Sequence, residues 1–217
     1  PVAMEYMDKE AIDICEAYAK AGYPLDVAAL LIIEVEGSDA EMDSALARIV
    51  AIAKQHKVKV VKESRSAMET AAIWKGRKSA FGATGRIADY ICMDGTIPTG
   101  RLPEVLTRID QIVTGYGLRV ANVFHAGDGN LHPLVMYDVN DPASAEKAEA
   151  AGMDILKLWV EVGGCLTGEH GVGIEKRDLM VHQFNRGDLH QQMRARAVFD
   201  PQWVLNPAKV FPLEDRI

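Results

Sequence analysis

The sequence predicts an α+β protein with a mainly antiparallel sheet, helices packed on one side of it in the ferredoxin-like style, and a C-terminal helical and loop segment. Three observations lead to this class. Strand and helix patterns alternate along most of the chain, two adjacent strands form a hairpin pattern, and no strand pattern follows residue 163. The 217 residues, 48% of them hydrophobic, are enough for one well-buried core.

The elements of the first half follow from hydrophobic periodicity and capping residues. Apolar residues recur at helical spacing in some segments and at every second position, or without interruption, in others. Ser38 or Asp39 is a suitable N-cap for the second helix. The expected elements are a helix at 8–21, a strand at 27–37, a helix ending near 55, a strand at 58–63 and a helix at 67–78.

Glycines and prolines divide the second half. The glycine-rich stretch 81–85 leads from the helix at 67–78 into the next strand. Pro103 and Pro142 suit helix starts, where the missing backbone N–H has no partner to lose. The expected elements are a strand at 87–94, a helix from 103 to 115 or 117, a hairpin at 118–138 and a helix at 142–162.

The hairpin is centred on HAGDGNLH, residues 125–132. Asp128 and Gly129 tolerate the positive φ of a tight two-residue turn, which predicts that His125 pairs with His132. Directly opposed residues have Cβ atoms about 4.5 to 5.5 Å apart, so the two imidazoles could bind one cation. A third ligand is still needed, and a carboxylate is the usual choice.

A second motif, GGCLTGEHGVG at residues 163–173, places Glu169 and His170 among five glycines. Consecutive side chains of an extended stretch point in opposite directions. Glu169 would then complete the metal site while His170 faces a substrate as general base. Two plainer interpretations stay open from the residues alone: ordinary hairpin histidines, and a glycine-rich connector.

The composition argues against several classes of protein. With 31 acidic and 24 basic residues the net charge is -7 and no basic stripe occurs, so nucleic-acid binding is not expected. The longest strictly apolar run, residues 27–33, is shorter than the roughly 20 residues of a membrane-spanning helix. Three widely spaced cysteines favour free thiols in a reducing, cytoplasmic compartment.

Five segments together resemble one enzyme family. They are NVFHAGDGNLHP (122–133), GGCLTGEHGVGIEKRDLM (163–180), NPAKVFP (206–212), DYICMDGTIP (89–98) and IWKGR (73–77). They are similar to the C-terminal half of the FAD-linked 2-hydroxy-acid oxidoreductases of the vanillyl-alcohol oxidase superfamily, with the flavoprotein subunits of bacterial glycolate oxidases nearest. The likeness extends over almost the whole chain.

The resemblance implies a domain organisation. Residues 1–162 would form an α+β substrate-binding (cap) domain and residues 163–217 a flavin-facing segment. An N-terminal FAD domain, which would hold most of the FAD, is expected to precede Pro1. The chain alone is therefore expected to have no turnover and little flavin affinity, and its uncovered face favours a homo-oligomer. Further oxidase subunits are expected partners, and a peripheral position on the inner membrane is compatible with the cytoplasmic location.

The resemblance also implies roles for single residues. By motif position, the divalent metal, expected to be zinc, would be held by His125, His132 and Glu169. His170 would act as the base, and Arg77 would bind the substrate carboxylate. Asn206 would lie beside the flavin. Hydride would pass to flavin N5 as the base takes the hydroxyl proton, which converts a 2-hydroxy acid to a 2-oxo acid. Cys92 and Leu134 stand where 2-hydroxyglutarate-type relatives have polar residues, and favour a small monocarboxylate such as glycolate or D-lactate.

Two other functions stay open at the level of the sequence. A metal-dependent hydrolase also uses two histidines and a glutamate with an open coordination position. A non-catalytic assembly module would use the hairpin only as structure. Flavin dependence separates the oxidoreductase from the hydrolase, and metal analysis separates both from the module.

Overall fold

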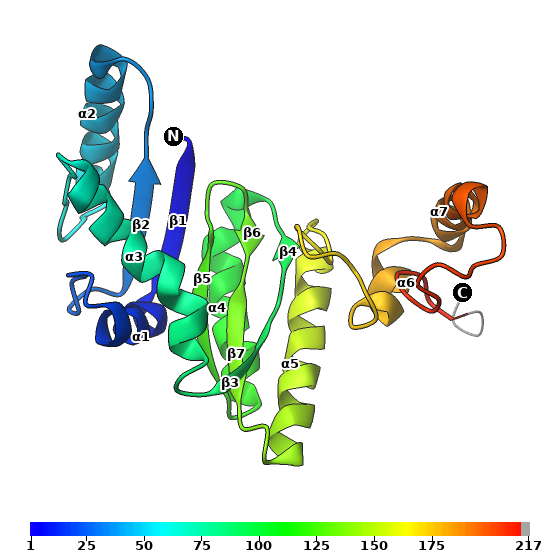
Figure 1. The fold of residues 1–217 in the computed structure, drawn as a ribbon. Coiled ribbons are helices and arrows are strands. Elements are labelled where there is room, and N and C mark those ends of the chain that lie inside the picture. Colours follow the sequence, from blue (N-terminus) through cyan, green and yellow to red (C-terminus); the bar gives the residue numbers. More distant parts are fainter. Residues whose placement is uncertain (214–217) are drawn as a thin grey trace.

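The computed structural model describes residues 1–213, and seven strands in this range form one sheet (Figure 1). The strands are β1 (Ala3–Asp8), β2 (Ala29–Glu34), β3 (Asp89–Cys92), β4 (Gly95–Thr96), β5 (Arg119–His125), β6 (Asn130–Leu131) and β7 (Pro133–Tyr137). The helices are α1 (Lys9–Ala19), α2 (Asp39–Gln55), α3 (Ala67–Thr84), α4 (Leu102–Gly115), α5 (Pro142–Glu161), α6 (Met180–Gln183) and α7 (Arg186–Phe199), with 3-10 turns η1 (Thr99–Arg101) and η2 (Arg177–Leu179).

All strand pairs of the sheet are antiparallel. β5 lies at its centre, with β1 and then β2 on one side. On the other side, β6 and β7 act as one strand that is broken at His132, and β4 and β3 pair with its two halves. The predicted α+β class with a mainly antiparallel sheet is confirmed.

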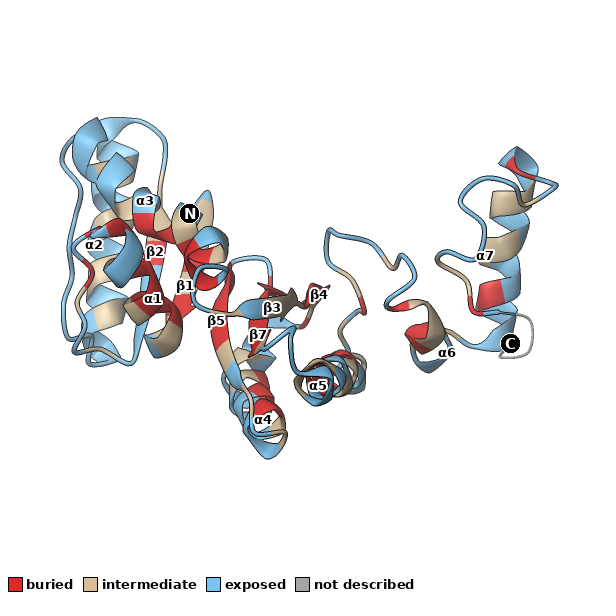
Figure 2. Cartoon of the chain, turned by 60° about the horizontal axis from the view of Figure 1, so that its bottom comes forward, coloured by how far each residue is buried: buried red, intermediate tan, exposed pale blue. Residues whose placement is uncertain are grey.

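The helices, however, cover both faces of this sheet, so their expected placement on one side needs correction. Successive residues of β5 point to opposite faces: Val123 packs into a core with α1 and α3, and Phe124 into a core with α4 and α5. Figure 2 shows α4 and α5 on the opposite side of the strands from α1 and α3. The physical reason lies in β5 and β7, where successive positions are buried without alternation, as in strands covered on both faces.

The hairpin register differs from the prediction by two residues. His125 pairs with Asn130, so the loop holds four residues, 126–129, and not the two-residue turn expected. Contacts from other strands decide this: the backbone N–H of Gly127 donates to Met4 (3.1 Å), and the carbonyl of Gly129 accepts from Ile97 (2.9 Å). A shift by an even number keeps every side chain on its face, so the two histidines still share one face.

Helix starts follow the capping residues seen in the sequence. Ser38 and Glu41 form a capping box at the start of α2. Asp141 caps α5, and Pro142 occupies its first turn. Asp8 caps α1 by accepting from the backbone N–H of Ala11.

Two local predictions are wrong, and one strand has no counterpart in the prediction. Residues 58–63 form no strand, because their side chains are exposed and their alternating valines meet no core. α3 extends to Thr84, beyond the helix end at residue 78 that the sequence predicts. β1 was not expected, because the charged Glu5 occupies a buried position and interrupts the apolar alternation.

The C-terminal segment contains helix and loop, as predicted. It begins at the sheet, where Cys165 forms an antiparallel bridge with Thr96, and its Leu166 and Leu179 join the core around α5. Beyond α6 the chain runs outward to α7, away from the sheet (Figure 1). The last four residues of the predicted segment 163–217 lie outside the described residues, and its boundary at 162 stays a prediction. None of the described helices is long and apolar enough to cross a membrane.

Candidate functional site

Four of the predicted site residues meet on the face of the sheet that α3 covers. His125 ends β5, His132 lies at the break between β6 and β7, and Glu169 and His170 come from the glycine-rich loop. The Oε1 atom of Glu169 lies 3.2 Å from Nε2 of His132 and 3.8 Å from Nε2 of both His125 and His170. The ring of His132 has its centroid 5.2 Å from that of His125 and 5.2 Å from that of His170.

His132 has the properties of a metal ligand. Its side chain is 3% exposed, and neither ring nitrogen has a hydrogen-bond partner within the described part of the chain. Burial, aided by the nearby His125, lowers the pKa of His132, which keeps the imidazole neutral with a free lone pair. Ligands about 2.0–2.1 Å from a tetrahedral cation lie about 3.3 Å apart. The 3.2 Å separation from Glu169 fits a shared divalent cation.

Asp94, between β3 and β4, holds the glycine-rich loop in place. Its fully buried carboxylate accepts hydrogen bonds from the backbone N–H groups of Gly168, Glu169 and His170 and from the hydroxyl of Thr167. Burial raises the pKa of Asp94, but these hydrogen bonds and the Lys176 ammonium, 3.3 Å away, outweigh burial and hold it well below its ordinary value. The carboxylate is therefore ionised near neutral pH, and the loop turns around it.

This turn overturns one expectation about Glu169 and His170. The sequence predicts side chains that point in opposite directions, as in an extended stretch, yet the ligand atoms of both lie in one group with His132 and Asp94, all within 4.8 Å of one another. Three consecutive N–H groups that converge on one carboxylate curl the backbone, so neighbouring side chains no longer alternate. Gly168 permits the curl, because a Cβ there would lie 2.3 Å from Oδ1 of Asn130.

The group of four residues whose ligand atoms lie within 4.8 Å of one another differs from the predicted ligand set. It contains His132 and Glu169 together with Asp94 and His170, and it does not contain His125. Asp94 is 3.6 Å from Nε2 of His132, but its oxygens are already engaged by the loop. His125 is farther from Glu169 than His132 is. The pair His132 and Glu169 is thus the centre of the site, and His125 and His170 flank it.

Arg77, predicted to hold the substrate carboxylate, is paired with a carboxylate of the chain itself. Its Nε and Nη2 atoms lie 3.0 and 2.9 Å from Oε2 of Glu5, and both side chains are more than nine-tenths buried. The other oxygen of Glu5 lies 2.8 Å from Nδ1 of His125. Sequence reasoning missed Glu5; the available signal was a lone acidic residue inside the apolar stretch AMEYM. A role of Arg77 toward substrate stays a prediction.

Comparison with known proteins places the chain in a family. Residues 1–210 match the family described as FAD linked oxidases, C-terminal domain. The chain belongs to this family. The glycolate oxidase subunit GlcD of Escherichia coli K12 is 44% identical over 98% of the chain, and that of Bacillus subtilis is 31% identical over 100%. D-lactate dehydrogenase [cytochrome] of Kluyveromyces lactis is 28% identical over 82%.

Solved structures of low identity share the fold of this oxidase domain. 4-Ethylphenol oxidase from Gulosibacter chungangensis covers 99% of the chain with a TM-score of 0.64 at 14% identity, and p-cresol methylhydroxylase covers 96% with 0.64 at 12% identity. The chain spans less than half of the relatives' own length: 43% and 46% of the two glycolate oxidase subunits, 31% of the lactate dehydrogenase, and 48% and 46% of the two solved chains.

Two apolar positions of this oxidase domain lie beside its histidines. Cys92 and Leu134 are directly paired in the β3–β7 ladder, on the face that α3 covers. Burial, together with the charge of Asp94, raises the pKa of the Cys92 thiol to about 12, so the thiol is neutral. Neither residue offers a charge to a second carboxylate on a substrate.

Asn206 lies in the C-terminal segment of the oxidase domain, where its Oδ1 accepts from Nζ of Lys209 at 3.1 Å. The same segment returns to the end of the glycine-rich loop, because the backbone N–H of Val210 donates to the carbonyl of Gly173 at 2.8 Å. The place of Asn206 beside a flavin stays a prediction.

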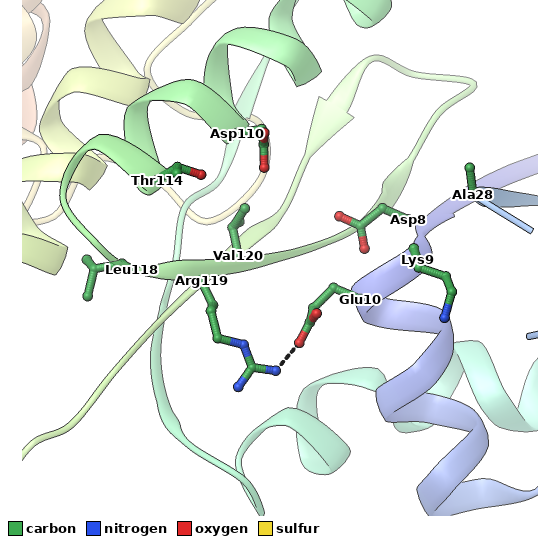
Figure 3. Close-up of a pocket in the computed structure, with 9 residues that line it drawn as sticks. All are labelled: Asp8, Lys9, Glu10, Ala28, Asp110, Thr114, Leu118, Arg119 and Val120. Carbon is green, nitrogen blue, oxygen red and sulfur yellow. Dashed lines mark hydrogen bonds and ion pairs between the residues drawn. The ribbon is translucent and has the colours of Figure 1, made fainter.

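A groove of about 370 Å³ lies elsewhere on the oxidase domain, between the start of α1 and the end of α4 (Figure 3). Arg119 and Glu10 form an ion pair across it. Asp8 is engaged by Ala11 and Asn122. The described residues that line the groove include no histidine, and Arg119, Glu10 and Asp8 are already engaged within the chain, so we do not place the site there.

Proposed function

We propose that this chain is the C-terminal, substrate-binding part of an FAD-dependent oxidoreductase that oxidises a small 2-hydroxy acid, glycolate or D-lactate, to the 2-oxo acid. The observation that carries the proposal is the buried Nε2 of His132, which makes no hydrogen bond within the described residues and lies 3.2 Å from Oε1 of Glu169. It supports a cation site in a chain whose relatives are named glycolate oxidase subunits and D-lactate dehydrogenases.

His125, His132 and Glu169 would hold the divalent cation, and zinc suits two imidazoles and a carboxylate. When bound, the cation would lower the pKa of a substrate hydroxyl and the flavin would accept the hydride. The carboxylate of Glu169 is half-exposed, so the site is open on the side where a substrate would enter. The low polarity of Cys92 and Leu134 favours a substrate with one carboxylate.

His170 would take the hydroxyl proton on its Nε2 atom. Its ring lies parallel to that of His132, with an angle of 8° between the planes, and its side chain is 49% exposed. An imidazole accepts a proton near neutral pH, which suits a general base. Arg77 would bind the substrate carboxylate with the part of its guanidinium that Glu5 does not use. Asn206 would face the flavin, which a preceding FAD domain would hold.

The test is turnover by the complete polypeptide that carries this chain, loaded with FAD and assayed with an artificial electron acceptor. Glycolate or D-lactate should be oxidised faster than the dicarboxylate 2-hydroxyglutarate, and removal of the metal by a chelator should abolish activity reversibly. Preference for the dicarboxylate would overturn the substrate assignment. Flavin-independent hydrolysis would support the metal-dependent hydrolase instead.

A further inference from the structure

Glu5 occupies a position that calls for an explanation, because it is a carboxylate that is only 6% exposed in the middle of a strand. Burial of a charge is unfavourable unless the charge is paired and hydrogen-bonded. Both of its oxygens are used: Oε1 lies 2.8 Å from Nδ1 of His125, and Oε2 lies 2.9 Å from Nη2 of Arg77.

The contact with His125 is built into the sheet. Glu5 and His125 are direct partners in the β1–β5 ladder, so their side chains emerge side by side on the same face. Arg77 reaches the same carboxylate from α3, which packs over that face. One strand register and one helix therefore bring the three side chains together.

This arrangement favours one tautomer of His125. A carboxylate that is paired with Arg77 accepts hydrogen bonds, so the 2.8 Å contact with Oε1 of Glu5 favours the form of the ring that carries its proton on Nδ1. The lone pair is then on Nε2, the atom that faces Glu169 at 3.8 Å. Metal-binding histidines use a carboxylate in this way, since it fixes the ring and makes the coordinating nitrogen more basic.

We propose that Glu5 is a positioning residue of the metal site: it holds His125 in the Nδ1–H form with Nε2 directed at Glu169, and it joins this ligand to Arg77. The proposal rests on the proposed function for the identity of the site. It assigns the buried Arg77–Glu5 pair to the organisation of the site and not to stability alone.

The first experiment measures binding of Co²⁺ to the 217-residue chain by its visible absorption bands, with Glu5→Gln compared to Asp8→Asn. Asp8 is a matched control, because it is a half-buried carboxylate of the same strand that contacts Ala11 and Asn122 and not the histidines. We expect Glu5→Gln to weaken Co²⁺ binding by roughly 10- to 100-fold. Asp8→Asn should leave it unchanged. Equal affinity in the Glu5→Gln and wild-type chains would overturn the proposal.

A second measurement does not depend on whether Glu5→Gln folds with Arg77 left unpaired. Long-range ¹H–¹⁵N spectra of the metal-free wild-type chain, assigned with His125→Gln, report which ring nitrogen carries the proton. We expect Nδ1–H for His125; a neutral ring with Nε2–H would overturn the proposal. The variant His132→Ala separates the proposed function from the role of Glu5. If His132→Ala binds Co²⁺ as well as wild type, the metal site and the proposed function are both wrong. If His132→Ala loses Co²⁺ binding and Glu5→Gln does not, only the positioning role of Glu5 is wrong.

Discussion

At the scale of residues, the glycine-rich loop and His125 are each held by a buried carboxylate that lies far away in the sequence. Asp94 accepts from the backbone of Gly168, 74 positions later, and Glu5 contacts His125, 120 positions later. Both neighbours are buried carboxylates that are completely engaged by donors. The exposed site residues Glu169 and His170 are held through their backbone N–H groups, which donate to the buried carboxylate of Asp94.

His170 gives the sharpest prediction at this scale. In the complete, FAD-loaded polypeptide, His170→Ala should lower kcat by about 100- to 10,000-fold, because the hydroxyl proton loses its acceptor. Metal content and flavin absorbance should stay at wild-type levels. Loss of the metal together with activity would instead identify His170 as a ligand, which its membership of the group of four residues with His132 would then explain.

At the scale of elements, the glycine-rich loop and α3 show two different uses of glycine. Gly168 has no room for a side chain, whereas Gly82 lies on an exposed turn of α3 with nothing within 4 Å of a Cβ. The same residue type is therefore required in one element and dispensable in the other.

Gly168→Ala should displace the loop, because its Cβ would lie 2.3 Å from Oδ1 of Asn130 and 2.8 Å from Oδ1 of Asp94. We expect the displaced Glu169 to weaken Co²⁺ binding to the chain at least as much as the loss of Glu5 does. The measurement is the same absorption titration. Wild-type affinity would show that the loop geometry does not control the site.

Gly82→Ala should raise the free energy of unfolding by roughly 0.5–1 kcal/mol, since alanine loses less conformational entropy than glycine in a helix interior. Urea denaturation of the chain measures this change. An unchanged or lowered free energy of unfolding would contradict the open helical environment of Gly82.

At the scale of the whole molecule, the sheet and its two helical layers form one body, from which α7 and the last described residues extend (Figure 1). This extension exposes large apolar side chains, with Phe199 85% and Val198 77% accessible. An apolar surface of this kind is typical of a contact with another domain or chain. We expect the FAD domain to cover it in the complete polypeptide.

The corresponding prediction concerns the 217 residues alone. They should show no turnover of 2-hydroxy acids and no flavin absorbance after addition of FAD and gel filtration, because FAD would be held mainly by the preceding domain. They should also self-associate at high concentration through the uncovered apolar side chains, which sedimentation velocity would detect. Flavin absorbance that stays with the 217-residue chain after gel filtration would contradict the prediction that a preceding domain holds most of the FAD.

The sequence by itself determined the fold class, the helix starts at Ser38 and Asp141, and the candidate metal ligands. These features depend on local periodicity, capping chemistry and short motifs, all of which lie within a few residues of chain. An even-numbered error in the hairpin register did no harm to the site, because side-chain direction repeats every two residues along a strand.

Only the tertiary structure decided which groups complete and orient that site. Glu5 had no strand pattern around it, and the curl at Glu169 depends on Asp94 from another strand pair. The placement of helices on both faces likewise required the packing of α1 and α3 against α4 and α5 through the sheet. Such contacts join residues that are distant along the chain, and hydrophobic patterns carry no information about which distant charges will be buried together.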